Sequence, residues 1–434
     1  MKVGRQWRFR KEELQQFLEG RGAVVDLPID PAPFLQALRD QLTDPSPFDA
    51  DPQVVSQPLD EAFRLMVELL VQRQAESLHL GAYHTTDTTR TAACLRSRTD
   101  GLLRLECELD RRLLAPLVET WKSTAGCHPQ ETGLPQDGRI LMETDTGGSP
   151  SRVVDLRVSF LPSMLGETMT VRWVNQGSGR AGLDDFPLLD SDKKRIRKAL
   201  VQRSRLLIVS GPPGSSVESL IGAGLTEIAG PEKRTITVEG PAWQIIPWSS
   251  SLSLYSLGKN RNYGTALRTA LRSEPDILGV KSLPDQEALE AAIEAALAGA
   301  LVIAGFGARS ALDALRDLMT LAPNQFSLLQ CLGLVVSTTR VRKLCEHCKV
   351  SSDGREWEPV GCGRCGGVGY SKSVFVGETL QVSRTFSELL LDGADDEALA
   401  EQARAEGTVF RAEQIGRLVR NGLTSAEEAG RVLQ

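Results

Sequence analysis

Residues 205–219 read RLLIVSGPPGSSVES, and this stretch decides the fold. RLLIVS has the apolar character of a buried strand, GPPG is a turn of glycine and proline, and a helical pattern follows over residues 217–229. A strand that runs directly into a glycine-containing turn and then a helix is the context that a phosphate-binding loop requires. The alternative is an unrelated strand–turn–helix in which glycine and proline serve geometry alone.

The loop lacks the side chains that a working phosphate loop uses. Such a loop needs Gly at its sixth position, then Lys for the phosphates, then Ser or Thr for Mg²⁺. These places hold Ser216, Val217 and Glu218. Val217 brings no charge, and Glu218 puts a carboxylate where a hydroxyl would hold Mg²⁺. The positions that remain for weak contact with a nucleotide are Gly211, Gly214, Ser215, Ser216, Val217 and Glu218.

Strands and helices alternate after the loop. The apolar runs TITVE, DILGV and LVIAGF predict further strands, and a helical pattern covers residues 285–298. Strands that alternate with helices of this length favour a mostly parallel sheet covered on both faces. We therefore predict an α/β fold for this part of the chain.

The chain divides into five segments. Residues 1–56 mix charged patches with proline-rich and aspartate-rich stretches and are expected to form a short arm or remnant domain. Residues 57–176 combine a helical pattern with short β-like runs, which predicts a smaller α+β domain. A linker at 177–183 follows, then the α/β domain at 184–383 and a helical segment at 384–434.

Two CxxC pairs are the strongest local signal. Cys345 and Cys348 form the first pair, and Cys362 and Cys365 form the second, with glycines directly after it. Four cysteines in this arrangement predict a structural Zn²⁺ site with no open position for water, within a module at 341–372. Reduced free thiols or disulfides are the alternatives. His347 is not expected to be a ligand.

Composition excludes several classes of protein. The chain has 434 residues, 41% of them hydrophobic, a formal net charge of −6 and a pI near 5.5. An acidic balance argues against a broad nucleic-acid surface. No signal-peptide run or membrane-spanning run is found, so we expect a cytoplasmic protein with reduced or zinc-bound cysteines.

The order of short sequence blocks adds a family resemblance. From about residue 57 to its end, the chain resembles the type II secretion and type IV pilus assembly ATPases. The blocks that carry this resemblance are LPQDGRI (134–140), DLRVSFLPSMLGETMTVRWV (155–174), GPPGSS, ITVEGP (236–241), LRTALRSEPDIL (267–278), EAAIEAALAGALV, the four-cysteine module and VGETLQV. The resemblance implies an α+β domain joined to a RecA-like P-loop domain, a ring of six copies, and ATP between the two domains.

The resemblance also locates the positions used for hydrolysis, and four of them are changed. Val217 replaces the loop lysine and Gly240 replaces the second acid of a pair that Glu239 begins. Ser282 replaces the glutamate that polarises the attacking water, with Lys281 beside it, and Gly307 replaces a histidine. We therefore expect no catalytic residue. The resemblance implies that four residues for nucleotide contact remain, namely Glu239, Asp276, Arg157 and Arg172. Two alternatives are open: Asp276 could cap the end of a strand, and the two arginines could pair with acids.

The predicted function is that of a pseudo-ATPase with a degenerate Walker A loop, which serves as a structural or regulatory subunit. By family analogy, its partners are further copies, an active homologue in a mixed ring, and an inner-membrane platform protein that would hold it at the membrane periphery. The alternative is an ATPase with a remodelled pocket that powers pilus assembly or secretion, with Lys281 or a neighbouring arginine in place of the loop lysine. A nucleic-acid role for the basic run RVRKLCEHCK is a third hypothesis, which the overall charge disfavours.

Overall fold

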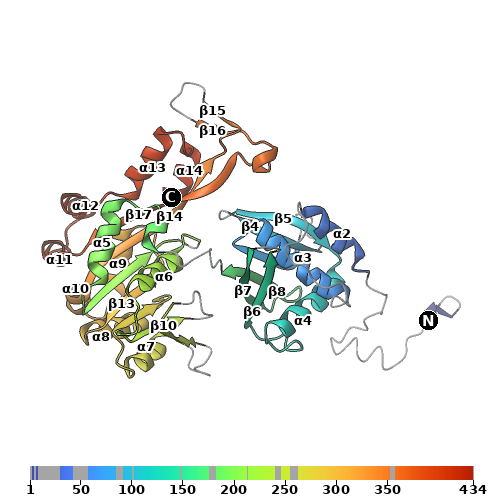
Figure 1. Ribbon diagram of the computed structural model, residues 1–434, viewed down its shortest axis with the longest axis horizontal. Coiled ribbons are helices and arrows are strands. Elements are labelled where there is room, and N and C mark those ends of the chain that lie inside the picture. The colour runs from blue at the N-terminus through green and yellow to red at the C-terminus, as the bar shows by residue number, and fades with distance from the viewer. Residues whose placement is uncertain are drawn as a thin grey trace.

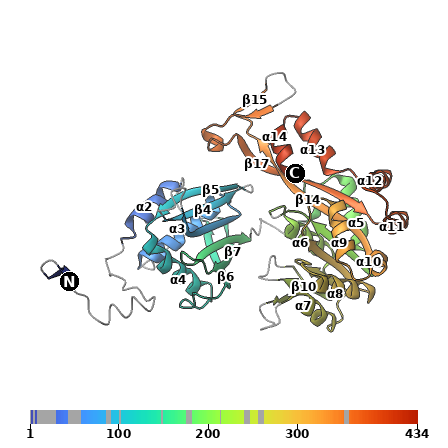
Figure 2. The ribbon, with the colours of Figure 1, turned by 180° about the vertical axis from the view of Figure 1, so that it is seen from behind.

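The computed structural model describes residues 2–3, 6–7, 30–42, 57–84, 91–99, 102–146, 149–174, 182–212, 214–239, 246–254, 262–351 and 357–433. Two parts are visible, one built from N-terminal elements and one from the rest of the chain (Figures 1 and 2). Across these described residues, no helix combines the length and the apolar character needed to span a bilayer.

The first part is an antiparallel sheet with helices against one face. The sheet has the order β5-β4-β3-β8-β7-β6. Its elements, with the small β1–β2 hairpin before them, are β1 (Lys2–Val3), β2 (Gln6–Trp7), α2 (Ala32–Gln41), α3 (Pro58–Gln72), β3 (Ser77–His84), β4 (Thr91–Thr99), β5 (Leu102–Leu109), η1 (Arg111–Leu113), α4 (Leu114–Thr124), β6 (Gln136–Thr146), β7 (Ser149–Leu161) and β8 (Thr168–Val174).

One face of this sheet and its helices share a core. Trp121 of α4 and Phe160 of β7 are fully buried in it, and the ring of Phe63 lies 4.4 Å from that of Trp121. Helix α2 comes from the stretch predicted as an arm, and it contributes Phe34 and Leu38 to the same core. The opposite face of the sheet is therefore left for polar residues, because side chains alternate along a strand.

The second part is a mostly parallel sheet, as predicted. Its order is β11-β10-β12-β13-β9-β14-β17, and β14 with β17 is the antiparallel pair. Its elements are η2 (Leu183–Asp185), α5 (Asp190–Leu200), β9 (Arg205–Ser210), α6 (Val217–Ile228), β10 (Thr235–Glu239), β11 (Ser249–Ser253), α7 (Tyr263–Leu271), β12 (Ile277–Val280), α8 (Gln286–Leu297), β13 (Leu301–Phe306), α9 (Ala311–Leu321), α10 (Gln325–Cys331), β14 (Leu332–Leu344) and β17 (Tyr370–Gln381).

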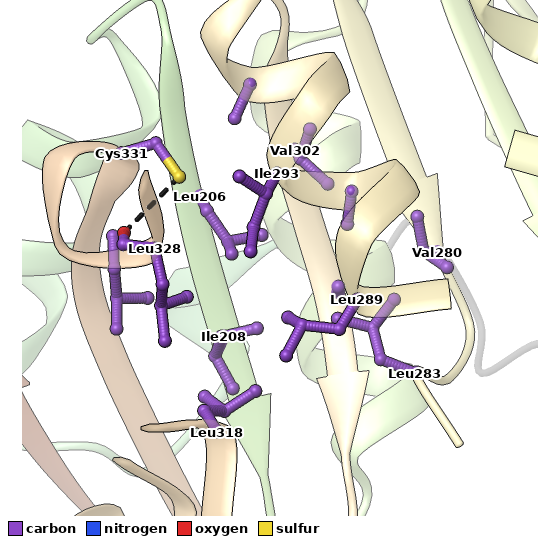
Figure 3. Packing of buried hydrophobic residues seen from close by; sticks show 14 of the residues in the cluster. Leu206, Ile208, Val280, Leu283, Leu289, Ile293, Val302, Leu318, Leu328 and Cys331 are labelled. Atoms are coloured by element: carbon purple, nitrogen blue, oxygen red, sulfur yellow. Dashed lines mark hydrogen bonds between the residues drawn. The ribbon is translucent and has the colours of Figure 1, made fainter. Parts of the chain in front are cut away.

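Helix α8 packs on strands β9 and β13 in the larger core of this part. Ile293 of the helix lies beside Leu206 and Val302 of the strands, and Leu289, further along the helix, lies beside Leu283 in the same cluster (Figure 3). The alanines between them are fully buried, and their small side chains let the helix lie close to the sheet. This packing fixes the sheet whose carboxyl edge carries the phosphate-type loop.

The C-terminal residues add a small hairpin and four helices. These elements are β15 (Lys349–Ser351), β16 (Trp357–Pro359), η4 (Gly363–Cys365), α11 (Arg384–Leu391), α12 (Asp396–Ala405), α13 (Arg411–Arg420) and α14 (Ala426–Leu433). Buried Glu378 of β17 accepts backbone hydrogen bonds from Ala311 at 2.7 Å and Arg411 at 2.8 Å, which ties α9 and α13 to the sheet. Burial raises the pKa of this carboxyl, although both amides oppose that shift. The five segment boundaries remain predictions.

Candidate functional site

The loop after β9 has the backbone of a phosphate loop. Gly214 has a φ of +85° and Ser216 has a φ of +66°, a left-handed conformation that a non-glycine residue adopts at some cost. Gly211 has no space for a side chain, since a Cβ there would lie 2.5 Å from the carbonyl oxygen of Thr338. Thr338 Oγ1 in turn donates to the carbonyl of Ser215 at 3.1 Å, which holds the loop against β14.

An ion pair occupies the place where the loop would hold metal. Glu218 is in the first turn of α6, and its Oε1 lies 3.0 Å from Nζ of Lys281, which follows β12. Val217 begins the helix and packs toward β13, 3.4 Å from a Cβ built on Gly305. The two charged residues that distinguish this sequence from a working loop therefore pair with each other.

The other altered positions lie on the same edge of the sheet where the structure describes them. Ser282 follows Lys281 directly after β12, and Gly307 follows β13. A Cβ built on Gly307 would meet nothing within 4 Å, so a larger side chain has space there. Glu239 ends β10 fully buried and accepts from Thr237 Oγ1 at 2.8 Å. Gly240 lies outside the described residues.

The position of Asp276 corrects one sequence prediction. Asp276 precedes β12, so it lies at the amino edge of the parallel sheet, whereas the loop lies at the carboxyl edge. Its Oδ2 accepts the backbone N–H of Arg234 at 2.9 Å, and Oδ1 lies 3.7 Å from Arg203 Nη2. Asp276 therefore does not join the nucleotide-type residues, and its contacts are those of a residue that caps the start of a strand.

Arg157 and Arg172 are directly opposite each other on β7 and β8, and a third arginine extends their row. Arg139 of β6 is opposite Arg157, which places the three side chains on one face of the sheet. Asp155 binds two of them, at 2.9 Å from Arg139 Nη2 and 3.3 Å from Arg157 Nη2. The sequence alone does not identify Arg139 as a residue of the candidate site. Its signal was present in the block LPQDGRI, which carries an arginine to the strand next to Arg157.

His79 of β3 lies on the polar side of the same sheet. It contacts Ser77 Oγ at 2.9 Å and Thr170 Oγ1 at 3.3 Å. Its pKa is lowered to about 4, first by burial and then by the charges of Arg98, Arg96 and Arg172. The charges of three arginines that lower this pKa place His79 beside a group of cations on this face of the sheet.

Several contacts bring the arginine-bearing sheet to the loop edge of the second part. Arg340 of β14 forms an ion pair of 2.9 Å with Glu76, which precedes β3. A Cβ built on loop residue Gly214 would lie 3.6 Å from the other carboxylate oxygen of Glu76. The pKa of Arg139 is raised, first by its hydrogen bond with Asp155, and the pKa of Arg157 is lowered, first by burial. The charge of Glu239 acts on both arginines as a smaller upward influence. The loop edge and the arginine row thus face one site.

The four CxxC cysteines converge as the sequence predicted. All four sulfurs lie within 4.8 Å of one another, and the Sγ atoms of Cys345 and Cys362, and of Cys348 and Cys365, are 3.9 and 3.8 Å apart. Sulfurs at about 2.3 Å from one tetrahedral Zn²⁺ would be about 3.8 Å apart, so the geometry fits a Zn²⁺ ion. Disulfides are excluded, because their sulfurs lie about 2.05 Å apart. His347 is outside this group and contacts Arg364 at 2.7 Å.

The sheet order, the strand–loop–helix unit and the α+β part beside it define the class: this is a protein with a P-loop NTPase fold. The family model described as "Type II/IV secretion system protein" matches residues 53–431. The chain belongs to that family.

Curated relatives include secretion and pilus proteins. The type II secretion system protein HxcR of Pseudomonas aeruginosa is 30% identical over 372 residues, which cover 85% of this chain and 76% of the relative. The type II secretion system ATPase E of Vibrio cholerae is 27% identical, with 86% and 75% covered. The type IV pilus assembly ATPase PilB of Thermus thermophilus is 28% identical, and the match covers 88% of this chain and 43% of that longer protein.

Solved structures agree on the fold. The ATPase DotB of Legionella pneumophila has a TM-score of 0.60 and 16% identity, with 86% of this chain and 95% of that chain covered. The pilus retraction motor PilT bound to ADP has a TM-score of 0.53 and 16% identity, with 85% and 95% covered. At this identity, the similarity establishes the architecture and leaves the chemistry to the residues.

Proposed function

We propose that this chain is a non-hydrolysing homologue of the type II secretion and type IV pilus assembly motors, which acts as a structural or regulatory subunit of such a machine. The observation that carries the proposal is the ion pair between Glu218 and Lys281 at the loop. In a working phosphate loop, a lysine and Mg²⁺ bind the phosphates and neutralise their negative charge. Here Lys281 is paired with Glu218, the acid at the position where a phosphate loop has the hydroxyl that holds Mg²⁺.

The other replacements support the same function. Ser282 has no basic group at neutral pH and so cannot orient an attacking water as a glutamate would. Gly307 offers no side chain, although the site has space for one. Loss of transition-state charge stabilisation alone costs several powers of ten in rate. With the loop lysine also absent, turnover is expected to be indistinguishable from background.

The proposed partners follow from the relatives. PilB and ATPase E are named for pilus assembly and type II secretion, and the chain keeps the architecture that it shares with them. We expect it to assemble with copies of itself or with an active homologue, and to meet an inner-membrane platform protein from the cytoplasmic side. In this function, Zn²⁺ at the four cysteines is structural and stabilises the module after β14.

Association tests this function directly. Purified zinc-loaded protein is analysed by sedimentation velocity, alone and mixed with an active homologue from the same cell, and the ATPase rate of the homologue is measured as this chain is added. We expect a larger assembly and a changed rate per homologue. If the chain stays monomeric, forms no complex with the homologue or the platform protein and leaves the rate unchanged, the proposed function is wrong.

A further inference from the structure

The described residues of the loop edge do not suit Mg²⁺ at the position of Glu218. The Glu218 carboxylate is paired with the Lys281 ammonium, which would repel a divalent cation at that position. Glu239, a second acid at this edge, is fully buried and accepts hydrogen bonds from Thr237 and Ser251. The metal that the family implies therefore does not fit the residues of this chain.

The sheet opposite the loop supplies positive charge without a metal. Arg139, Arg157 and Arg172 occupy directly paired positions on three adjacent strands. Like charges directly opposite on neighbouring strands destabilise a sheet. Asp155 pairs with Arg139 and Arg157, and the charge of Glu239 also favours both guanidinium groups, so part of this repulsion is offset. An anion over this face would relieve the rest.

Arg157 is the member of this row whose side chain has a buried donor without a partner among the described residues. It is 8% exposed, and its Nε is buried without a hydrogen-bond partner among the described residues. Burial is the largest influence on its pKa and lowers it, and the repulsion of Arg139 acts in the same direction. A buried charged donor without a partner is costly, and an anion that is absent from the described structure accounts for it.

We propose that the site takes a phosphate-chain anion, such as the diphosphate or triphosphate group of a nucleotide, in its metal-free form, with guanidinium groups in place of Mg²⁺ and the loop lysine. This rests on the proposed function, because the same replacements that prevent hydrolysis remove the metal. Guanidinium groups suit this ligand, since their N–H groups donate charge-assisted hydrogen bonds to phosphate oxygens.

The proposal makes the role of Mg²⁺ opposite to that in a working P-loop enzyme. A free phosphate chain carries more negative charge than its Mg²⁺ complex, so the arginine row attracts the free form more strongly. Added Mg²⁺ should therefore weaken binding or leave it unchanged.

The experiment is a titration of the full zinc-loaded chain with a fluorescent ADP analogue, in EDTA-buffered and in MgCl₂-containing solutions of equal ionic strength. Zinc is retained by preloading and checked after the titration. Arg157→Gln removes the buried guanidinium, and Arg172→Gln removes an exposed one from the same row, so at least one variant should stay folded. Arg384→Gln is the matched control, because Arg384 lies exposed on α11 and pairs with Glu388. Competition by pyrophosphate separates binding of the phosphate chain from binding of the nucleoside.

We expect binding in EDTA that is as tight as in MgCl₂ or tighter, and each row variant should weaken it about tenfold or more. The control should bind as the wild type does. Displacement by pyrophosphate identifies the phosphate chain as the ligand group. Binding that requires Mg²⁺, row variants that bind normally, or no binding by folded protein would each overturn the inference. None of these three outcomes contradicts the proposed function. Phosphate release from MgATP would contradict the proposed function, so the two claims fail by different results.

Discussion

Lys281 Nζ and Glu218 Oε1 lie 3.0 Å apart, which joins the residue after β12 to the first turn of α6. Their side chains are 24% and 46% exposed, so solvent screens the pair. Lys281→Met, Glu218→Gln and the double variant form a double-mutant cycle. We expect a coupling energy of about 0.2–1 kcal/mol in urea unfolding, decreasing with salt. A coupling of zero at low salt would show that the pair does not form in solution.

Zinc content tests the four-cysteine module. Cys345→Ser or Cys362→Ser removes one thiolate from a closed set of four, so the purified variant should lose most of its zinc and melt at lower temperature. Metal analysis by mass spectrometry and a thermal melt measure both effects. Cys127→Ser is the control, because this cysteine lies in the first part of the chain, away from the module. A Cys345→Ser protein with full zinc content would rule out the proposed ligand set.

The lowered pKa of His79 predicts that the free energy of unfolding falls in mild acid. Its pKa is about 4 in the folded chain against 6.5 for an ordinary histidine, because burial and three arginines disfavour the charged form. The unfolded chain therefore binds more protons between about pH 6.5 and 4, and stability falls as the pH is lowered through this window. His79→Gln should flatten that part of the curve of unfolding free energy against pH. The exposed His128→Gln should retain the wild-type shape, and an unchanged curve for His79→Gln would contradict the assignment.

Two leucines of α8 provide a test of the core. Leu289 is fully buried against β9 and β13, whereas Leu297 at the end of the same helix is 44% exposed. Leu289→Ala should cost about 2–5 kcal/mol of unfolding free energy, because it leaves a cavity. Leu297→Ala should change it by about 0.5 kcal/mol or less. Similar values for the two variants in urea unfolding would show that the helix does not pack as described.

Much of the second part could be predicted from the sequence, because its strands are short apolar runs between helices. RLLIVS and LVIAGF became β9 and β13 with the predicted ends. The two CxxC pairs also converged as expected, since their spacing itself constrains four sulfurs. These features are local, which is why one sequence was enough.

The contacts of the candidate site depended on pairing between distant segments. Lys281 was recognised as a charge beside the loop, but only the adjacency of strands shows that Glu218 is its partner. Only the register of β6 with β7 shows that Arg139 lies opposite Arg157, in the row of arginines. For Asp276 the sequence leaves two roles open, nucleotide contact and capping of a strand end. Its bond to Arg234 N–H fits the second, because a residue at the start of a parallel strand lies opposite the loops that follow the strands.

The most direct test of the central claim is steady-state phosphate release from MgATP by the full zinc-loaded chain, under conditions in which an active homologue turns over. We predict release indistinguishable from that of buffer, because the proposed function has Val217 in place of the loop lysine, Ser282 in place of the water-polarising glutamate, and the Glu218–Lys281 pair at the metal position. Release above that background that disappears in Arg172→Ala would contradict it and would identify an ATPase with a remodelled pocket.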